Sequence, residues 1–196
     1  DISNPSVPVQ ISTTSVDAGP HGIYVSGRYA YVAGASNNSV AIVDISNSKS
    51  PIQVGSVSVP SVIRDIQVVG KYAYLNYDSG GIIVLDVSNP RAPALVVSTS
   101  FSGTNPNAIA VSGRYAYLAE DAARILVVDI SNPAAPILVG STTVGLSPQA
   151  IAVSGRYAYV ANGGENTMSV VDISNPLAPV QVATTTVGGT PLSVAV

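Results

Sequence analysis

The chain has 196 residues, of which 46% are hydrophobic and only 10% are charged, with a formal net charge of −3 and no cysteine. This hydrophobic content can fill a packed core, whereas the scarcity of Lys and Arg argues against nucleic acid and anionic membranes as partners. The missing cysteine excludes disulfides, thiolate catalysis and cysteine-ligated metals, and every apolar run is too short to span a bilayer.

An internal repeat organises the predicted elements. A tetrad of the form Asp-Ile/Val-Ser-Asn begins at Asp1, Asp44, Asp86, Asp129 and Asp172, so successive copies lie 42 or 43 residues apart. In chain order we expect a strand near residues 7–16, four full units at about 22–59, 65–100, 108–143 and 150–186, and a final strand at Leu192–Val196. All of them are predicted to belong to one domain, residues 1–196.

Each unit contains four short runs of strand-forming residues separated by turn formers. In the third unit these runs are IAV, RYAYLA, RILVVDI and PILVGSTTV. The breaks between them are too short for a helix. Four antiparallel strands in a unit of about 40 to 45 residues are typical of a β-propeller blade, so the sequence predicts an all-β propeller. Its strands are named A to D, counted outward from the axis.

The segment SGRYAY predicts how neighbouring blades pack. It occurs at Ser26–Tyr31, Ser112–Tyr117 and Ser154–Tyr159, with a near copy, VGKYAY, at Val69–Tyr74. Its glycine is expected to adopt a positive φ in the tight turn from strand A to strand B. Alternate residues of a strand point to opposite faces, so both tyrosines form a large core layer that can pack on a small alanine layer of the next blade.

A second repeated segment, DISNPxAP, is predicted to form the corner between strands C and D. Its Asp and Asn side chains can accept hydrogen bonds from backbone groups in a turn, and its prolines cannot donate to a β-ladder. The corner shares one end of the blade with the A–B turn, where a basic residue recurs at Arg28, Lys71, Arg114 and Arg156. We expect these cations to pair with the corner Asp residues and stabilise the framework rather than form a basic binding ring.

Two segments carry a resemblance to known repeats. ILVVDISNPAAPILVG, at Ile125–Gly140, resembles the LVIVD repeat, and YAYVANGGENTMSVVDIS, at Tyr157–Ser174, is similar to the YVTN-type repeats of bacterial and archaeal surface-protein propellers. The resemblance implies a propeller of roughly six to eight blades that is secreted or bound to the cell surface, without assigned catalysis. Since the sequence holds four full units, we expect an excerpt of such a propeller, whose uncovered blade faces favour self-association.

Few residues could support catalysis or metal binding. YDSGGI, at Tyr77–Ile82, resembles the nucleophile loop of trypsin-like serine proteases. Ser79 lies in a predicted Gly-rich B–C turn, however, and the only histidine, His21, lies in a loop of the preceding unit. One histidine cannot build a multi-histidine site, and no Asp-rich calcium loop occurs. We therefore predict no catalytic residue, no metal and no cofactor.

The opposite end of the propeller carries the D–A and B–C loops, which differ between units and therefore mark the predicted recognition end. Two residues before the first Ile or Val of strand A, the units carry His21, Arg64, Asn107, Gln149 and Leu192. The first four are polar and are predicted to surround the mouth of the central channel. There they could hydrogen-bond a ligand or merely be solvated.

Three functions stay open. The leading hypothesis is a non-catalytic, extracytoplasmic scaffold that binds a protein or a surface glycan through these loops. A second is a lactonase-like or other small-molecule hydrolase whose catalytic residues lie in blades outside this sequence. The third is a structural adhesin stalk without a ligand. Acidic or histidine residues at the mouth positions of further blades would favour the hydrolase.

Overall fold

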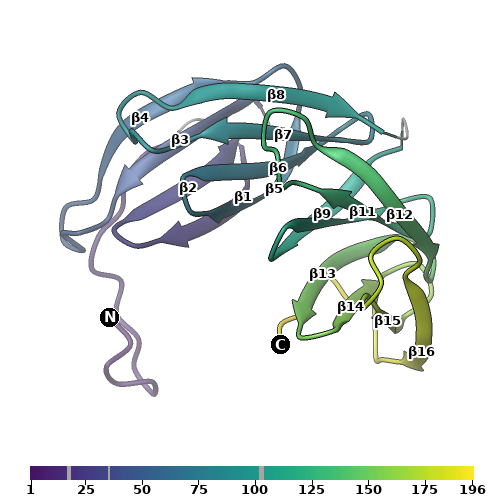
Figure 1. Cartoon of the computed structure of the whole chain (residues 1–196). Helices are drawn as coiled ribbons and strands as arrows, with labels where there is room; N and C mark the ends of the chain where they lie inside the picture. Colours follow the sequence, from purple (N-terminus) through teal and green to yellow (C-terminus); the bar gives the residue numbers. More distant parts are fainter. Residues whose placement is uncertain (17–18, 35, 102–103) are drawn as a thin grey trace.

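Four antiparallel sheets of four strands follow one another in the computed structural model, which describes residues 1–16, 19–34, 36–101 and 104–196 (Figure 1). Within each sheet the strands lie side by side in chain order, so each sheet is a meander of the kind that forms a propeller blade. None of the described residues forms a helix, and so none forms one long and apolar enough to cross a membrane.

The strand bounds follow the repeat. Blade 1 consists of β1 (Pro20–Ser26), β2 (Tyr29–Gly34), β3 (Ser39–Asp44) and β4 (Ile52–Ser58), and blade 2 of β5 (Ile63–Val69), β6 (Tyr72–Tyr77), β7 (Gly81–Asp86) and β8 (Ala94–Ser100). Blade 3 consists of β9 (Pro106–Ser112), β10 (Tyr115–Glu120), β11 (Arg124–Asp129) and β12 (Ile137–Thr143), and blade 4 of β13 (Pro148–Ser154), β14 (Tyr157–Asn162), β15 (Thr167–Asp172) and β16 (Val180–Thr186).

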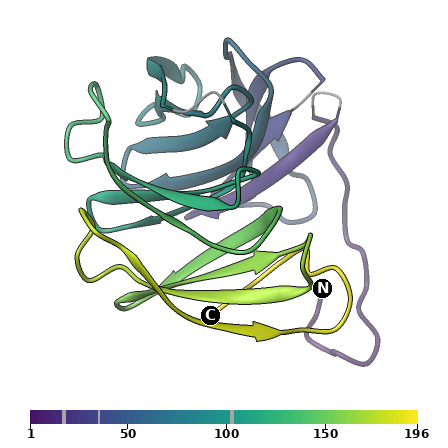
Figure 2. The same cartoon turned by 90° about the vertical axis from the view of Figure 1, so that its right-hand side faces the viewer.

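The first strands of the blades line a common axis. β1 contacts β5, β5 contacts β9, and β9 contacts β13, so the innermost strands of neighbouring blades are adjacent. Figures 1 and 2 show that the four blades form an arc, which is open between blade 1 and blade 4. The prediction of an all-β propeller with four full blades is therefore confirmed.

Buried side chains gather between neighbouring blades, in the arrangement that the repeat predicts. Among the described residues, Tyr31 clusters with Ala73 and Leu75 between blades 1 and 2, Tyr74 with Ala116 and Leu118 between blades 2 and 3, and Tyr117 with Ala158 and Val160 between blades 3 and 4. These three tyrosines are only 3–5% exposed. The tyrosine layer of one blade thus packs on the small layer of the next.

The first tyrosine of each copy is only half-buried, and in the first three blades it packs against the edge of the core. It begins strand B beside the A–B turn, where the basic residue of the turn covers its ring. The cation lies 5.1–5.4 Å from the ring centroid in the pairs Arg28–Tyr29, Lys71–Tyr72, Arg114–Tyr115 and Arg156–Tyr157. This contact is a cation–π interaction at the surface.

The A–B turns and the C–D corners have the predicted backbone conformations. The turn glycines Gly27, Gly70, Gly113 and Gly155 have φ between +58° and +60°. In the first corner, Asp44 accepts a hydrogen bond from the amide of Ser46 at 3.0 Å, and Asn47 accepts one from the amide of Lys49 at 3.1 Å. The other corners repeat this pattern, so the Asp and Asn side chains stabilise the turn in every corner.

Three of the four predicted ion pairs across this end of the blades form, namely Arg28–Asp44, Arg114–Asp129 and Arg156–Asp172. Hydrogen bonds from Ser174 and then from Arg156 lower the pKa of Asp172 to about 2. Those from Ser131 and then from Arg114 lower the pKa of Asp129 to about 2 as well. Both carboxylates are therefore held in their charged form by the framework.

Acid is expected to weaken the fold through these carboxylates. A folded-state pKa below the unfolded value of about 3.8 contributes stability that is complete above pH 4 and is lost as the pH falls toward 2. In urea unfolding, Asp172→Asn should reduce the free energy of unfolding at pH 6 and should lose less of it than the wild type between pH 4 and pH 2. Equal losses in the two proteins would contradict this role for Asp172.

The two predicted end strands do not form. Residues 7–16 and Leu192–Val196 contain no strand, because neither segment pairs with a strand of the four described sheets. The N-terminal corner itself is present, since Asp1 accepts a hydrogen bond from the amide of Ser3 at 2.9 Å. Residues 12–14 and 16 then lie over the outer face of blade 1, and the C-terminal residues line the channel beside β13.

Candidate functional site

The axis ends of the four first strands bring the predicted mouth residues together. A cavity of about 420 Å³ at the axis is lined by His21, Arg64, Asn107, Gln149 and Leu192, among others. The first four lie near the start of β1, β5, β9 and β13, in the same register position of each blade. Because successive blades are rotated about the axis, equivalent positions face a shared space.

Three of the four polar mouth side chains are held by neighbouring groups. Arg64 Nε donates a hydrogen bond to Asp78 Oδ1 at 2.7 Å, and Asn107 Nδ2 donates to Asp121 Oδ1 at 2.6 Å. Gln149 Nε2 donates to the carbonyl oxygen of Ser147 at 3.2 Å. Asp78 and Asp121 directly follow the second strand of their blades, so the B–C turns orient the side chains at the start of the first strands.

Asp65 also lines the cavity, although sequence reasoning missed it. Its carboxylate accepts hydrogen bonds from the amide of Ile66 at 2.8 Å and from the amide of Ile109, in blade 3, at 3.2 Å. Burial raises the pKa of this carboxyl, and the two amides oppose the shift. The signal was present in the sequence, because the equivalent positions of the other blades hold only glycine or alanine: Gly22, Ala108 and Ala150.

The buried side-chain amide of Asn76 holds the backbone of Asp65 in place. Asn76 is fully buried, and its Oδ1 accepts a hydrogen bond from the backbone amide of Asp65 at 2.7 Å. Its Nδ2 donates to the carbonyl oxygen of Pro106, in blade 3, also at 2.7 Å. The other blades carry alanine at this position. Blade 2 therefore contains a polar network, absent from the repeat pattern, that joins it to blade 3 directly beneath the mouth.

The space beside Asp65 also depends on blade 1. A Cβ at Gly22 would lie 3.0 Å from the Cα of Asp65 and 3.3 Å from its Oδ1. These distances are shorter than ordinary van der Waals contacts, and because one of the atoms belongs to the backbone, the strand itself would have to shift to relieve them. Glycine at position 22 thus leaves room for the carboxyl of Asp65 between three blades.

Around the mouth the described acidic side chains outnumber the basic ones. The hydrogen bond to Asp78, opposed by burial, raises the pKa of Arg64, and the charge of Asp121 adds to this shift. The guanidinium pairs with Asp78 and is also attracted by the charge of Asp121, while the carboxyl of Asp65 faces the same cavity. Among the described residues, no group of three or more His, Asp or Glu side chains is placed to hold a metal ion.

Ser79 occupies the turn that was predicted for it. It follows β6 with a φ of +87°, its amide donates a hydrogen bond to Asn105 Oδ1 at 3.2 Å, and its carbonyl oxygen accepts one from Ser100 Oγ at 2.7 Å. The histidine, His21, is expected in a loop from the sequence but lies instead in strand β1 of the preceding blade. Five positions in the variable loops, residues 17–18, Ala35 and residues 102–103, lie outside the described residues.

Meandering four-stranded sheets around a polar axis cavity define a repeat protein of the β-propeller class. The LVIVD repeat matches the chain four times, at residues 20–59, 63–100, 105–144 and 147–186. The chain therefore belongs to the LVIVD repeat family, and the resemblance to the LVIVD repeat noted in its sequence is confirmed. No curated protein sequence matches the chain.

Solved propellers of different functions share this fold. A protein from Bacteroides uniformis, provisionally assigned as a 6-phosphogluconolactonase, is 18% identical with a TM-score of 0.77, and the match covers 88% of this chain and 56% of that one. The periplasmic gluconolactonase PpgL of Pseudomonas aeruginosa is 19% identical with a TM-score of 0.76, over 88% and 55% of the two chains.

The β-propeller domain of Cps50 (Swd1) from Myceliophteria thermophila is 12% identical with a TM-score of 0.64, over 80% and 52% of the two chains. The present chain thus spans little more than half the length of each of these proteins. At identities this low the likeness establishes the fold alone.

Proposed function

We propose that this LVIVD propeller is a non-catalytic scaffold whose channel mouth binds a neutral, hydroxyl-rich ligand, with a surface glycan as the class that fits best. The observation that carries the proposal is the polar cavity of about 420 Å³, to which four successive blades each contribute a different side chain. Gln149 and Gln67 carry carboxamides, which can donate and accept hydrogen bonds at once, whereas Asn107 offers its Oδ1 as an acceptor because its Nδ2 donates to Asp121 and Pro148. Sugar hydroxyls require this dual capacity.

The charge balance supports a neutral ligand over an anionic one. A phosphate or carboxylate entering the mouth would have to compete with Asp78 for Arg64 and would approach the carboxyl of Asp65. Like charges brought close in a partly buried site repel each other strongly. A neutral polyol avoids this repulsion and can still accept a hydrogen bond from Arg64.

Removing two mouth side chains should weaken glycan binding without unfolding the blades. Arg64→Ala together with Gln149→Ala removes two hydrogen-bonding groups worth about 0.5 to 1.5 kcal/mol each. Their loss corresponds to an affinity roughly 5- to 150-fold lower. The measurement is a titration with the neutral oligosaccharide that gives the strongest signal on a glycan array.

Arg114→Ala is the matched control, because Arg114 lies at the opposite end of the blades, paired with Asp129. It should leave glycan affinity unchanged and affect only thermal stability. Unchanged binding by the double variant would remove the mouth as the site, and binding of immobilised proteins but of no glycan would favour a protein ligand instead.

An extracytoplasmic location is part of the proposal. It is supported by the family resemblance and by the periplasmic gluconolactonase among the proteins of similar fold. A glycan-binding scaffold also needs access to glycans, which are abundant outside the cytoplasm. Recovery of the native protein in the cytoplasmic fraction would contradict this part.

Hydrolysis of a small lactone is the second candidate, favoured by one specific observation. Asp65 is a half-buried acid whose pKa burial has raised, and it faces the cavity, as a general acid or base must. Two proteins of similar fold carry lactonase descriptions. If the wild type releases acid from glucono-1,5-lactone and Asp65→Asn does not, the protein is a lactonase. If the wild type releases no acid above the spontaneous rate, this candidate is excluded and the scaffold function stands.

A further inference from the structure

One face of each blade packs against the tyrosine layer of the preceding blade, and we call it the receiving face. In blade 1 this face is uncovered, and its side chains Ile23, Ala30, Val32, Val43 and Ile45 line one cavity. Ile23 is 65% exposed. Its equivalents in blades 2, 3 and 4, which are Ile66, Ile109 and Ile151, are 0%, 1% and 8% exposed because a preceding blade packs on them.

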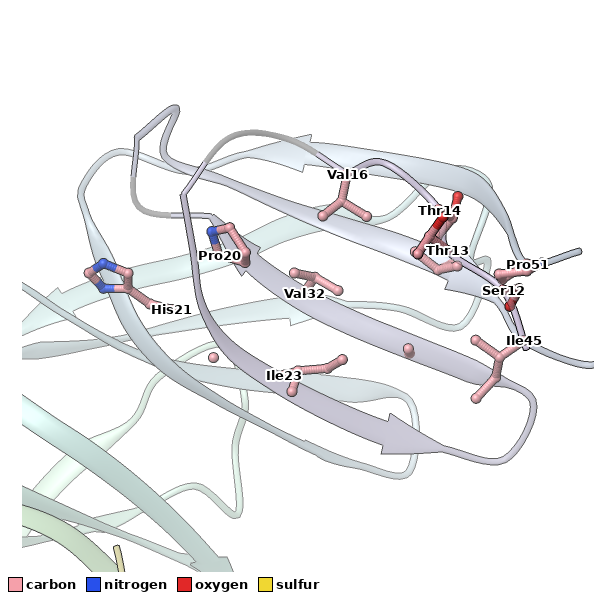
Figure 3. Close-up of a pocket in the computed structure, with 13 residues that line it drawn as sticks. Ser12, Thr13, Thr14, Val16, Pro20, His21, Ile23, Val32, Ile45 and Pro51 are labelled. Carbon is pink, nitrogen blue, oxygen red and sulfur yellow. The ribbon is translucent and has the colours of Figure 1, made fainter. Parts of the chain in front are cut away.

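Figure 3 shows this cavity, which measures about 540 Å³. The N-terminal residues Ser12, Thr13, Thr14 and Val16 run along one side of it, and Ile23 and Val32 point into it from the sheet. None of the described residues that line it is an Asp, Glu, Lys or Arg. At the three interfaces inside the arc, the tyrosine layer of the preceding blade occupies the corresponding place.

The tyrosine face of blade 4 is uncovered in the same way at the other end of the arc. We define it by Tyr157, Tyr159, Met168, Val170 and Val182. Val182 is 53% exposed, whereas its equivalents Val54, Val96 and Val139 pack against the cores that join their blade to the next one. Tyr159 is half-buried, whereas Tyr31, Tyr74 and Tyr117 are buried.

We propose that the receiving face of one copy of this chain binds the tyrosine face of a second copy, head to tail. The occupant follows from the molecule itself, because the same pair of faces already packs together three times inside the arc. Each interface joins a large layer to a small one, so the two end faces complement each other and neither complements itself. Burial of their aliphatic and aromatic side chains supplies the driving force.

The N-terminal segment must move for the two faces to meet. Ser12 Oγ donates a hydrogen bond to the carbonyl oxygen of Ser48 at 2.6 Å, and residues 7–16 form no strand ladder with blade 1. Displacing such a segment costs little compared with covering the apolar face. A head-to-tail contact of this kind closes into a ring when the rotation permits and otherwise extends into an open chain.

The experiment is sedimentation equilibrium of the full chain across a concentration series. The wild type is expected to show a mass that rises above that of the monomer with concentration. Ile23→Glu places a charge on the receiving face, and Val182→Glu places one on the tyrosine face, so each should raise the dissociation constant by tenfold or more. Both positions are exposed in the single chain, and thermal unfolding verifies that each variant folds.

Mixing the two variants tests the orientation. The mixture pairs an intact tyrosine face from Ile23→Glu with an intact receiving face from Val182→Glu, so association should return. Ile137→Glu is the matched control, because Ile137 is 61% exposed but lies on the outer strand of blade 3, away from both faces. It should associate like the wild type.

Three outcomes would overturn the proposal. One is a wild type that stays monomeric at every concentration, whether or not it binds a hydrophobic dye, since a dye-binding monomer would leave the faces open to a different occupant. Another is association that neither variant weakens. The third is a mixture that stays as weak as its components, since this would show that the copies do not meet head to tail.

Discussion

Replacing Arg124 with Leu is expected to lower the free energy of unfolding by about 3 to 5 kcal/mol. Glu120 is fully buried at the end of β10, and Arg124 at the start of β11 pairs with it at 2.6 Å between Nε and Oε2. Removing the guanidinium takes away one partner of a carboxylate that is itself fully buried. Weakening the compensation of a buried charge costs more than the modest net value of the pair itself.

Urea unfolding at neutral pH measures this effect. The double variant Glu120→Gln, Arg124→Leu removes both charges and should recover most of the loss. Arg91→Leu changes an exposed arginine in a corner and should shift the free energy of unfolding by no more than about 0.5 kcal/mol. A loss below about 1 kcal/mol in Arg124→Leu would mean that the other neighbours of Glu120 stabilise its charge without the arginine.

The parts of the fold that could be predicted are those that every blade repeats. A positive φ at Gly113, a turn-forming Asp129 and a buried Tyr117 serve the same purpose in their blade as their equivalents serve in the others. Comparison of the copies within one chain therefore reveals each role, because local backbone geometry and the face-to-face packing of blades fix it.

The site could be predicted only in part, because it consists of departures from the repeat. His21, Arg64, Asn107 and Gln149 were located by register alone, which determines where a side chain points but not what it bonds to. The hydrogen bonds of Arg64 with Asp78 and of Asn107 with Asp121 join residues 14 apart across a turn. Such pairings depend on loop shape, which varies from blade to blade.

Asp65 and Asn76 illustrate the second limit. Both occupy positions that hold only glycine or alanine in the other blades, and a propeller core tolerates the extra volume and polarity only because blade 1 leaves space at Gly22 and blade 3 offers Pro106 as an acceptor. Those neighbours come from other units of the chain. An acid at a position where the other blades carry glycine or alanine can thus be noticed in the sequence. What the acid contacts becomes clear only when the arrangement of three blades is known.

The end strands were mispredicted for a related reason. The composition of residues 7–16 resembles that of a fourth strand, yet a strand is stable only beside another strand with free backbone groups. Each described sheet ends after four strands, and neither terminal segment pairs with its first or last strand. Local sequence preference could not reveal that the partner was missing.

Replacing Leu118 with Ala is expected to lower the free energy of unfolding by about 2 to 5 kcal/mol, because it leaves a cavity in a fully buried position between blades 2 and 3. The core there includes Tyr74 and Ala116, so the cavity lies at the central interface of the arc. Each blade packs only on its neighbours, so weakening this interface should also reduce the cooperativity of unfolding between the first two blades and the last two.

Urea unfolding followed by tyrosine fluorescence and by far-ultraviolet circular dichroism measures both effects. The wild-type transitions should coincide, whereas those of Leu118→Ala should separate or broaden with a smaller dependence on urea. Leu177→Ala is the control, because Leu177 is 69% exposed in a corner and its truncation removes little packing. Coincident transitions and a loss below about 1 kcal/mol in Leu118→Ala would show that the blades do not depend on this interface, and would contradict a core built from successive tyrosine and alanine layers.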